Sequence, residues 1–185
     1  AMLSPEGVWR RLRLGRGRGS MASWIPLALA TPAIGLITSM VMSLFVDELS
    51  ESLKMLEGIF RRPEGWFALV LYFLIGVVPG VAEELLFRGY LQSRLEKRWP
   101  IWVAVFISAL IFGLAHMDPM HSLAVVPLGL WLGVISYRTN SLWPAMLGHM
   151  VNNLVSVAMT RHAPESESVL DNSTLGENLS DPLTL

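Results

Sequence analysis

The sequence predicts an all-α fold, a polytopic transmembrane helical bundle of about five spans. Of its 185 residues, 52% are hydrophobic and 16% are charged, and the mean hydropathy is +0.48, unlike the balance of a soluble domain. Long uncharged segments recur along the chain, and about 20 apolar residues are enough for a helix to cross a bilayer. Basic residues gather between these segments, as they do in the cytoplasmic loops of membrane proteins.

Five apolar segments, separated by polar residues, are the expected spans. The first has no charged residue over about 22 positions and lacks the cleavage site of a signal peptide, so we expect a retained anchor. Pro79 and Gly80 lie near the end of the second and are expected to bend it. Gly129 and Gly133 in the fourth form a small-xxx-small pattern, which favours close helix packing. The expected spans are residues 24–45, 65–82, 100–116, 122–137 and 142–160.

The chain divides into four expected parts. Residues 1–20 form a basic N-terminal segment, expected to be flexible and cytoplasmic, and residues 21–64 hold the anchor span and a polar connector. Residues 65–160 form the core, and residues 161–185 form a polar tail expected to be disordered. The chain opens with Ala rather than Met, as expected either of a fragment of a longer protein or of a sequence that carries a cloning remnant.

The distribution of charge and the absence of Cys narrow the possible functions. Five arginines lie within residues 10–18, although the net charge is only −1. A basic segment before a first span is the ordinary positive-inside signal, so it places the N-terminus in the cytoplasm and requires no nucleic-acid partner. The lack of Cys excludes disulfides and thiolate metal ligands. We expect an integral protein of a bacterial or archaeal cell membrane, in contact with the lipid bilayer.

Two adjacent acids and an arginine follow the second apolar segment. Glu84 and Arg88 are four residues apart, so on a helix they share one face with the acid on the N-terminal side, the favourable order for an ion pair. Glu83 points about 100° away and has no such partner in its own helix. Ionisable groups within a bilayer are costly and commonly functional. We therefore expect Glu84 and Arg88 to form a structural pair and Glu83 to be available for catalysis.

Two histidines and an asparagine are the other candidates within the spans. His149 and Asn153 are four residues apart and share a helical face, and Phe112 is likewise placed beside His116. A carboxylate in apolar surroundings suits a general base acting on water, and imidazole and amide groups can donate hydrogen bonds to a developing oxyanion. Peptide-bond hydrolysis requires these groups. Each histidine could instead make a structural hydrogen bond between helices.

Metal binding is an alternative for the same residues. A carboxylate and two imidazoles can hold zinc, so a metal, if present, would be bound by Glu83, His116 and His149. We assign no metal and expect that no cofactor is required. The other histidines, His121 and His162, lie at a span edge and in the tail, where we expect them to be solvated. With straight spans Glu83 and His116 would lie near opposite membrane faces, so a tilted or broken helix is needed to bring them together.

Three motifs follow one another in the order Glu-Glu-x-x-x-Arg, Phe-x-x-x-His and His-x-x-x-Asn. In this order and spacing they resemble the motifs of the CPBP family of intramembrane proteases, which includes the CAAX prenyl endopeptidases and the bacterial Abi proteins. The match covers about residues 66–158, half of the chain. The motifs read Glu83-Glu84-Leu-Leu-Phe-Arg88, Phe112-Gly-Leu-Ala-His116 and His149-Met-Val-Asn-Asn153.

The resemblance implies a helical bundle with a cavity open to the cytosol. It implies that Glu83 activates water with help from His116, and that His149 and Asn153 hold the oxyanion. The expected function is that of a CAAX-type intramembrane endopeptidase, a hydrolase that cleaves a membrane-associated protein or a lipidated, prenylated peptide, in a family labelled as metalloproteases. Relatives commonly have six to eight spans, so this chain is short for the family.

Two other functional classes fit part of the pattern. A non-catalytic membrane scaffold or bacteriocin-immunity factor of the same fold would bind a peptide without cutting it. A proton-coupled transporter would also use buried acids, but these acids would be spread along a path through the bundle. The acids within the spans are clustered instead, which argues against transport.

Overall fold

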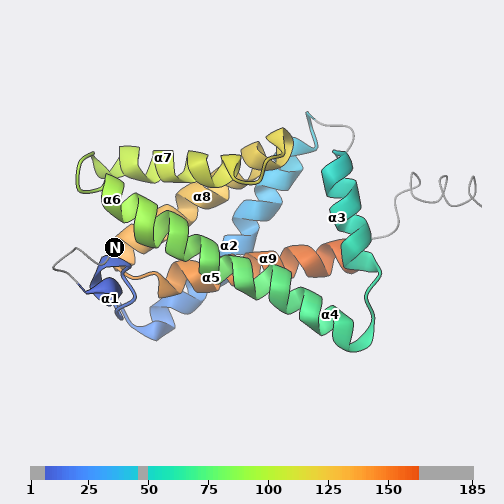
Figure 1. The fold of residues 1–185 in the computed structure, drawn as a ribbon, viewed down its shortest axis with the longest axis horizontal. Coiled ribbons are helices and arrows are strands. Elements are labelled where there is room, and N and C mark those ends of the chain that lie inside the picture. Colours follow the sequence, from blue (N-terminus) through green and yellow to red (C-terminus); the bar gives the residue numbers. More distant parts are fainter. Residues whose placement is uncertain (1–6, 46–49, 163–185) are drawn as a thin grey trace, which may run out of the picture.

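The structure of the protein is a computed structural model that describes residues 7–45 and 50–162. Every regular element in these residues is a helix, and none is a strand (Figure 1). The elements are α1 (Val8–Arg11), α2 (Met21–Met42), α3 (Glu51–Arg61), α4 (Gly65–Leu71), η1 (Tyr72–Val77), α5 (Val78–Glu84), η2 (Leu85–Gln92), α6 (Ser93–Leu95), α7 (Ile101–Leu114), α8 (Pro119–Thr139) and α9 (Trp143–His162).

The predicted fold class, an all-helical membrane bundle, is confirmed. By length and apolarity, three helices of the described residues can cross a membrane, rather than the five expected: Met21–Met42, Gly65–Leu95 and Pro119–Thr139. Helix α7 has only 14 residues, about 21 Å at 1.5 Å per residue, which is shorter than a hydrocarbon core of ~30 Å. Helix α9 is long enough, but its polar residues lower its hydropathy. Of the tail predicted in residues 161–185, all but the first two residues lie outside the described part.

Helix α9 is the central element of the bundle. It contacts α2, α3, η1, α5 and α8, while α7 packs mainly on α8 and η2 (Figure 1). Because α9 touches helices from both halves of the chain, its polar residues His149 and Asn152 are buried between helices. This placement is how a helix with a modest apolar content is accommodated in the bundle.

The helix of the second expected span continues beyond residue 82 and runs over Gly65–Leu95, as the helical spacing of Glu84 and Arg88 requires. Two segments of wider, π-helical turns flank the place where a bend was expected at Pro79 and Gly80: η1 lies before Pro79 and η2 lies after Glu84. Proline has no N–H to donate to the carbonyl four residues earlier, here that of Ile75. The Asn153 side-chain amide nitrogen lies 3.5 Å from this oxygen, so a neighbouring helix supplies a donor in place of the missing N–H.

Close contact between helices depends on the two predicted small residues of α8. A Cβ added to Gly129 would lie 3.1 Å from the Ala109 side chain of α7, which is tighter than an ordinary contact. The backbone carbonyls of these glycines are therefore accessible to the next helix. Gly129 O accepts from Arg88 Nη2 at 3.0 Å, and Gly133 O accepts from Gln92 Nε2 at 3.1 Å. The small-xxx-small pattern thus acts through exposed carbonyls as well as through packing.

The basic N-terminal segment is docked on the bundle from residue 13 to residue 18, in contrast to the flexibility expected. Arg13 pairs with Glu96 at the end of the long helix, and Arg18 N donates to Thr139 O at 2.6 Å. Gly17 has φ +65°, and a Cβ there would clash with Thr139 O, so glycine permits the approach. The basic N-terminal segment therefore lies at the same end of the bundle as the end of the long helix and the end of α8.

A fully buried ion pair joins the long helix to its neighbours. Glu84 and Arg88 are both 0% exposed, and Arg88 Nη1 lies 2.6 Å from Glu84 Oε1, which confirms the pairing expected from their spacing. Besides its bond to Gly129 O, the guanidinium lies 4.4 Å from the centre of the Phe112 ring. Three interactions of different kinds therefore replace the water that Arg88 loses on burial.

Removal of one partner of this pair should destabilise the fold. Arg88→Ala and Glu84→Gln each leave an uncompensated buried group, a defect that typically costs about 3–5 kcal/mol. We expect both variants to show a clearly lower melting temperature and folded yield in detergent. Arg94→Ala, an exposed arginine of the same helix, is the matched control and should melt like the wild type. Equal melting temperatures for Arg88→Ala and Arg94→Ala would contradict a structural role for the pair.

Candidate active site

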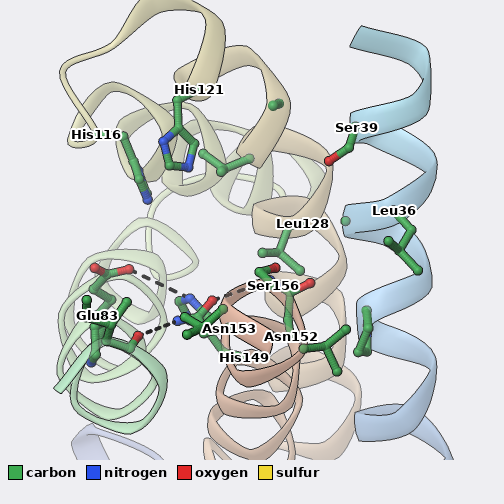
Figure 2. A pocket seen from close by; sticks show the side chains of 18 of the residues that line it. Leu36, Ser39, Glu83, His116, His121, Leu128, His149, Asn152, Asn153 and Ser156 are labelled. Atoms are coloured by element: carbon green, nitrogen blue, oxygen red, sulfur yellow. Dashed lines mark hydrogen bonds and ion pairs between the residues drawn. The ribbon is translucent and has the colours of Figure 1, made fainter. Parts of the chain in front are cut away.

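A cavity of about 350 Å³ opens between α2, α3, α5, α8 and α9 (Figure 2). The four residues predicted to be catalytic, Glu83, His116, His149 and Asn153, all line it. Straight spans would place Glu83 and His116 near opposite membrane faces, but in the structure both residues line this cavity. Glu83 lies well inside the 31-residue helix, and α7 is short, so His116 at its end reaches the same cavity.

Glu83 is the accessible member of the acid pair. Its side chain is 33% exposed, whereas that of Glu84 is 0% exposed. Figure 2 shows Glu83 turned toward the cavity, with the His149 ring across from it. The distance from Glu83 Oε2 to His149 Nε2 is 3.9 Å, too long for a direct hydrogen bond. Glu83 is therefore a carboxylate that can meet water or a substrate in the cavity.

His149 is held by the other carboxylate. Its Nδ1 lies 3.0 Å from Glu84 Oε1, the same oxygen that pairs with Arg88. An ionised carboxylate only accepts hydrogen bonds, so Nδ1 is the donor and the ring orientation is fixed. Nε2 then faces Glu83 and the cavity. The ring can donate from Nε2 only when both nitrogens carry protons, that is, as an imidazolium.

His116 is oriented by its own helix. Its Nδ1 lies 3.0 Å from the Phe112 carbonyl, and a carbonyl only accepts, so Nδ1 donates and a neutral ring has its lone pair on Nε2. In Figure 2 the His116 ring is directed toward Glu83 across the cavity. Such a nitrogen can accept a hydrogen bond from water.

Two residues near the cavity differ from the sequence-based expectations. His121, expected to be solvated, is only partly exposed and lines the cavity, with its ring centre 4.7 Å from that of His116. The reason is that α8 begins at Pro119 and its first turn packs toward the end of α7. Phe112, expected to pack beside His116, also contacts Arg88, Phe87 and His149, with ring centres 5.3 Å and 5.7 Å away for the last two. No local signal identifies these contacts, because all three come from other helices, η2 and α9.

Asn152 was not singled out from the sequence, although it lines the cavity and is 8% exposed. Its neighbour Asn153 drew attention because it lies four residues after His149. On a helix, the residues three and four positions after His149 both lie near it, and here both are asparagines. This pair of adjacent asparagines was the sequence signal that could have pointed to Asn152.

Helix α3 closes one side of the cavity, which Leu56 and Phe60 line. Ser52 Oγ donates to Asp118 Oδ2 at 3.1 Å, and Arg161 Nη1 donates to Phe60 O at 3.0 Å, so α3 is tied to α8 and to α9. The backbone N–H of His121 is the main reason that the pKa of Asp118 lies below its usual range. Asp118 is therefore ionised at neutral pH and remains an acceptor.

The possible metal ligands within the described residues are His, Asp and Glu side chains. Across residues 7–45 and 50–162, no group of three or more His, Asp or Glu side chains is placed to hold a metal ion. Glu83, His116 and His149, the ligands that a metal would use, line one cavity without forming such a group. We therefore assign no chemical step to a metal.

Comparisons with known proteins find one family model and one curated protein similar to this chain. Residues 65–155 match the sequence model of the Rce1-like family, described as type II CAAX prenyl endopeptidase Rce1-like. A Bacillus subtilis (strain 168) protein named "Putative membrane peptidase YdiL" is 28% identical over 93 residues, which cover 50% of this chain and 38% of that protein. The chain therefore spans well under half of that relative's length. No solved structure matches at a significant level.

The matched residues hold all three motifs, and helices α2 and α3 precede them. Residues 65–155 of the chain are therefore similar to the Rce1-like family, which is described as type II CAAX prenyl endopeptidase Rce1-like.

Proposed function

We propose that the protein is an intramembrane endopeptidase that hydrolyses a peptide bond of a membrane-associated protein or a lipidated peptide by means of glutamate-activated water. The observation that supports this most strongly is the division of the acid pair. Glu84 is fully buried and bound to Arg88 and His149. Glu83 is 33% exposed on a cavity that three imidazoles, those of His116, His121 and His149, also line. One acid is thereby committed to structure and the other is available as a base.

The proposed reaction begins with a water between Glu83 and His116. Glu83 takes a proton from this water, and the resulting hydroxide attacks the carbonyl carbon of the scissile bond. His116 Nε2 accepts a hydrogen bond from the same water and orients it. As the carbonyl π bond opens, the negative charge moves to its oxygen, and the protonated Glu83 then gives its proton to the leaving nitrogen as the C–N bond breaks.

The developing oxyanion requires donors on the opposite side of the cavity from the base. His149 Nε2–H and the Asn153 amide are the candidates, since both side chains project from one face of α9. A single donor of this kind contributes about 3–4 kcal/mol in well-studied enzymes. His149 can serve as this donor only as an imidazolium, because its Nδ1–H is already bound to Glu84. Asn153 would exchange its long bond to Ile75 O for the substrate oxygen.

Glu83→Gln should abolish hydrolysis without unfolding the protein. A glutamine cannot take the proton of water, and general-base catalysis contributes about 10²–10⁴-fold, so we expect the cleavage rate to fall by at least that factor. The assay uses protein in liposomes and a library of internally quenched, prenylated and unprenylated peptides. Glu64→Gln, an exposed acid just before the long helix, is the matched control.

Two results would reject the proposal. Cleavage by Glu83→Gln at the wild-type rate would show that this carboxylate is not the base. Failure of the folded wild type to cleave any peptide that it binds would favour the non-catalytic scaffold or immunity factor instead.

We further propose that the reaction requires no metal, because the proposed base, orienting group and oxyanion donors are all side chains of the chain. Cleavage should therefore continue at an unchanged rate after dialysis against EDTA or 1,10-phenanthroline, with the metal content checked by mass spectrometry. Complete loss of activity, restored by zinc alone, would show a metal centre.

A further inference from the structure

Asn152 occupies a different part of the cavity from the proposed catalytic groups. It lies one helical turn beyond His149 on α9, on the side that faces α2 (Figure 2). Its side chain is buried at 8% exposure. The proposed hydrolysis does not use it.

The hydrogen-bonding capacity of this amide is largely unused. Within the described part of the chain, Asn152 makes one side-chain hydrogen bond, from Nδ2 to Asn153 Oδ1 at a long 3.4 Å. An asparagine amide offers two N–H donors and an oxygen with two lone pairs. Buried polar groups are normally satisfied, so an amide that lines a cavity with most of its capacity free is suited to a ligand with both a donor and an acceptor.

The position of the amide is set by a glycine outside the matched family region. A Cβ added to Gly35 of α2 would lie only 2.6 Å from Asn152 Oδ1. Any larger residue at position 35 would therefore displace the amide. The absence of a side chain there allows α2 to form the wall of the cavity beside Asn152, and α2 precedes residues 65–155.

The distance along α9 indicates which ligand group would fit. Side chains three residues apart on a helix have Cβ atoms about 5–6 Å apart, and an extended peptide advances about 3.3 Å per residue. A peptide whose scissile carbonyl lies at His149 would therefore place another peptide group, one or two residues away, at Asn152. A peptide group presents one N–H and one C=O, which is the complement of a primary amide.

We propose that Asn152 binds the main chain of the substrate, pairing its side-chain amide with a peptide group one or two residues from the scissile bond. Gly35 keeps this amide in place. The proposal rests on the proposed endopeptidase function and adds to it a binding residue that reads the substrate backbone rather than its side chains. Recognition of this kind would tolerate varied sequences at that position.

The test compares Asn152→Ala and Gly35→Ala with Gly58→Ala, whose added Cβ meets no atom within 4 Å. The probe is the quenched peptide that the wild type cleaves best. We expect KM to rise about tenfold in both Asn152→Ala and Gly35→Ala, because each change removes one or two hydrogen bonds to the substrate. The value of kcat should stay nearly unchanged. The variant that combines both substitutions should show no further rise in KM. Gly58→Ala should keep the wild-type KM.

A series of variants of this peptide, each N-methylated at one backbone nitrogen, separates a role of Asn152 in substrate binding from a purely structural role. The dissociation constant of each methylated peptide is measured with the Glu83→Gln protein, which is expected to bind the peptide without cutting it. Methylation at one position near the scissile bond should weaken binding to that protein but not to the Glu83→Gln, Asn152→Ala double variant.

The two proposals fail in different ways. If the wild type cleaves but Asn152→Ala changes only the melting temperature or kcat, or if no methylated position depends on Asn152, the inference about Asn152 is wrong. If the wild type binds the peptides without cleaving them, the proposed function is wrong, and the methylation series still decides whether Asn152 binds the peptide backbone.

Discussion

One carboxylate oxygen, Glu84 Oε1, holds the site together, because it accepts from Arg88 within its own helix and from His149 of α9. The carboxylate is fully buried, and a buried charge without partners is very costly. Its two partners are therefore constrained to remain where they are. Arg88 in turn donates to Gly129 O of α8, so a single charge network ties the long helix to both α8 and α9 and fixes the cavity wall between them.

The same network explains why two adjacent glutamates can have different roles. A helix turns about 100° per residue, so the residue next to a buried carboxylate faces another direction, here the cavity. Glu83 Oε2 then lies 3.9 Å from His149 Nε2, too far for a direct hydrogen bond. Burial of one acid thus leaves its neighbour free, and the orientation of His149 depends on the acid that is buried.

Local spacing predicted the Glu84–Arg88 pair and the helical class, because both depend on residues within one helix. The convergence of Glu83, His116, His149 and Asn153 on one cavity came from the family resemblance rather than from spacing. Contacts between helices could not be predicted, including the bond from His149 to Glu84 and the approach of α2 to Asn152 at Gly35. The docking of residues 13–18 was also missed, since backbone hydrogen bonds to the α8–α9 connector leave no periodic signal in a basic, glycine-containing segment.

The central claim, that Glu84 fixes His149 through Nδ1, is tested most directly by the protonation pattern of the His149 ring. Two-dimensional NMR of protein labelled with ¹⁵N-histidine reports which ring nitrogens carry protons, and a His149→Gln sample assigns the resonance. The structure predicts a proton on His149 Nδ1 with the shift of a hydrogen bond to a carboxylate, and loss of that signature in Glu84→Leu but not in Glu83→Gln. A His149 ring protonated on Nε2 alone would contradict the account.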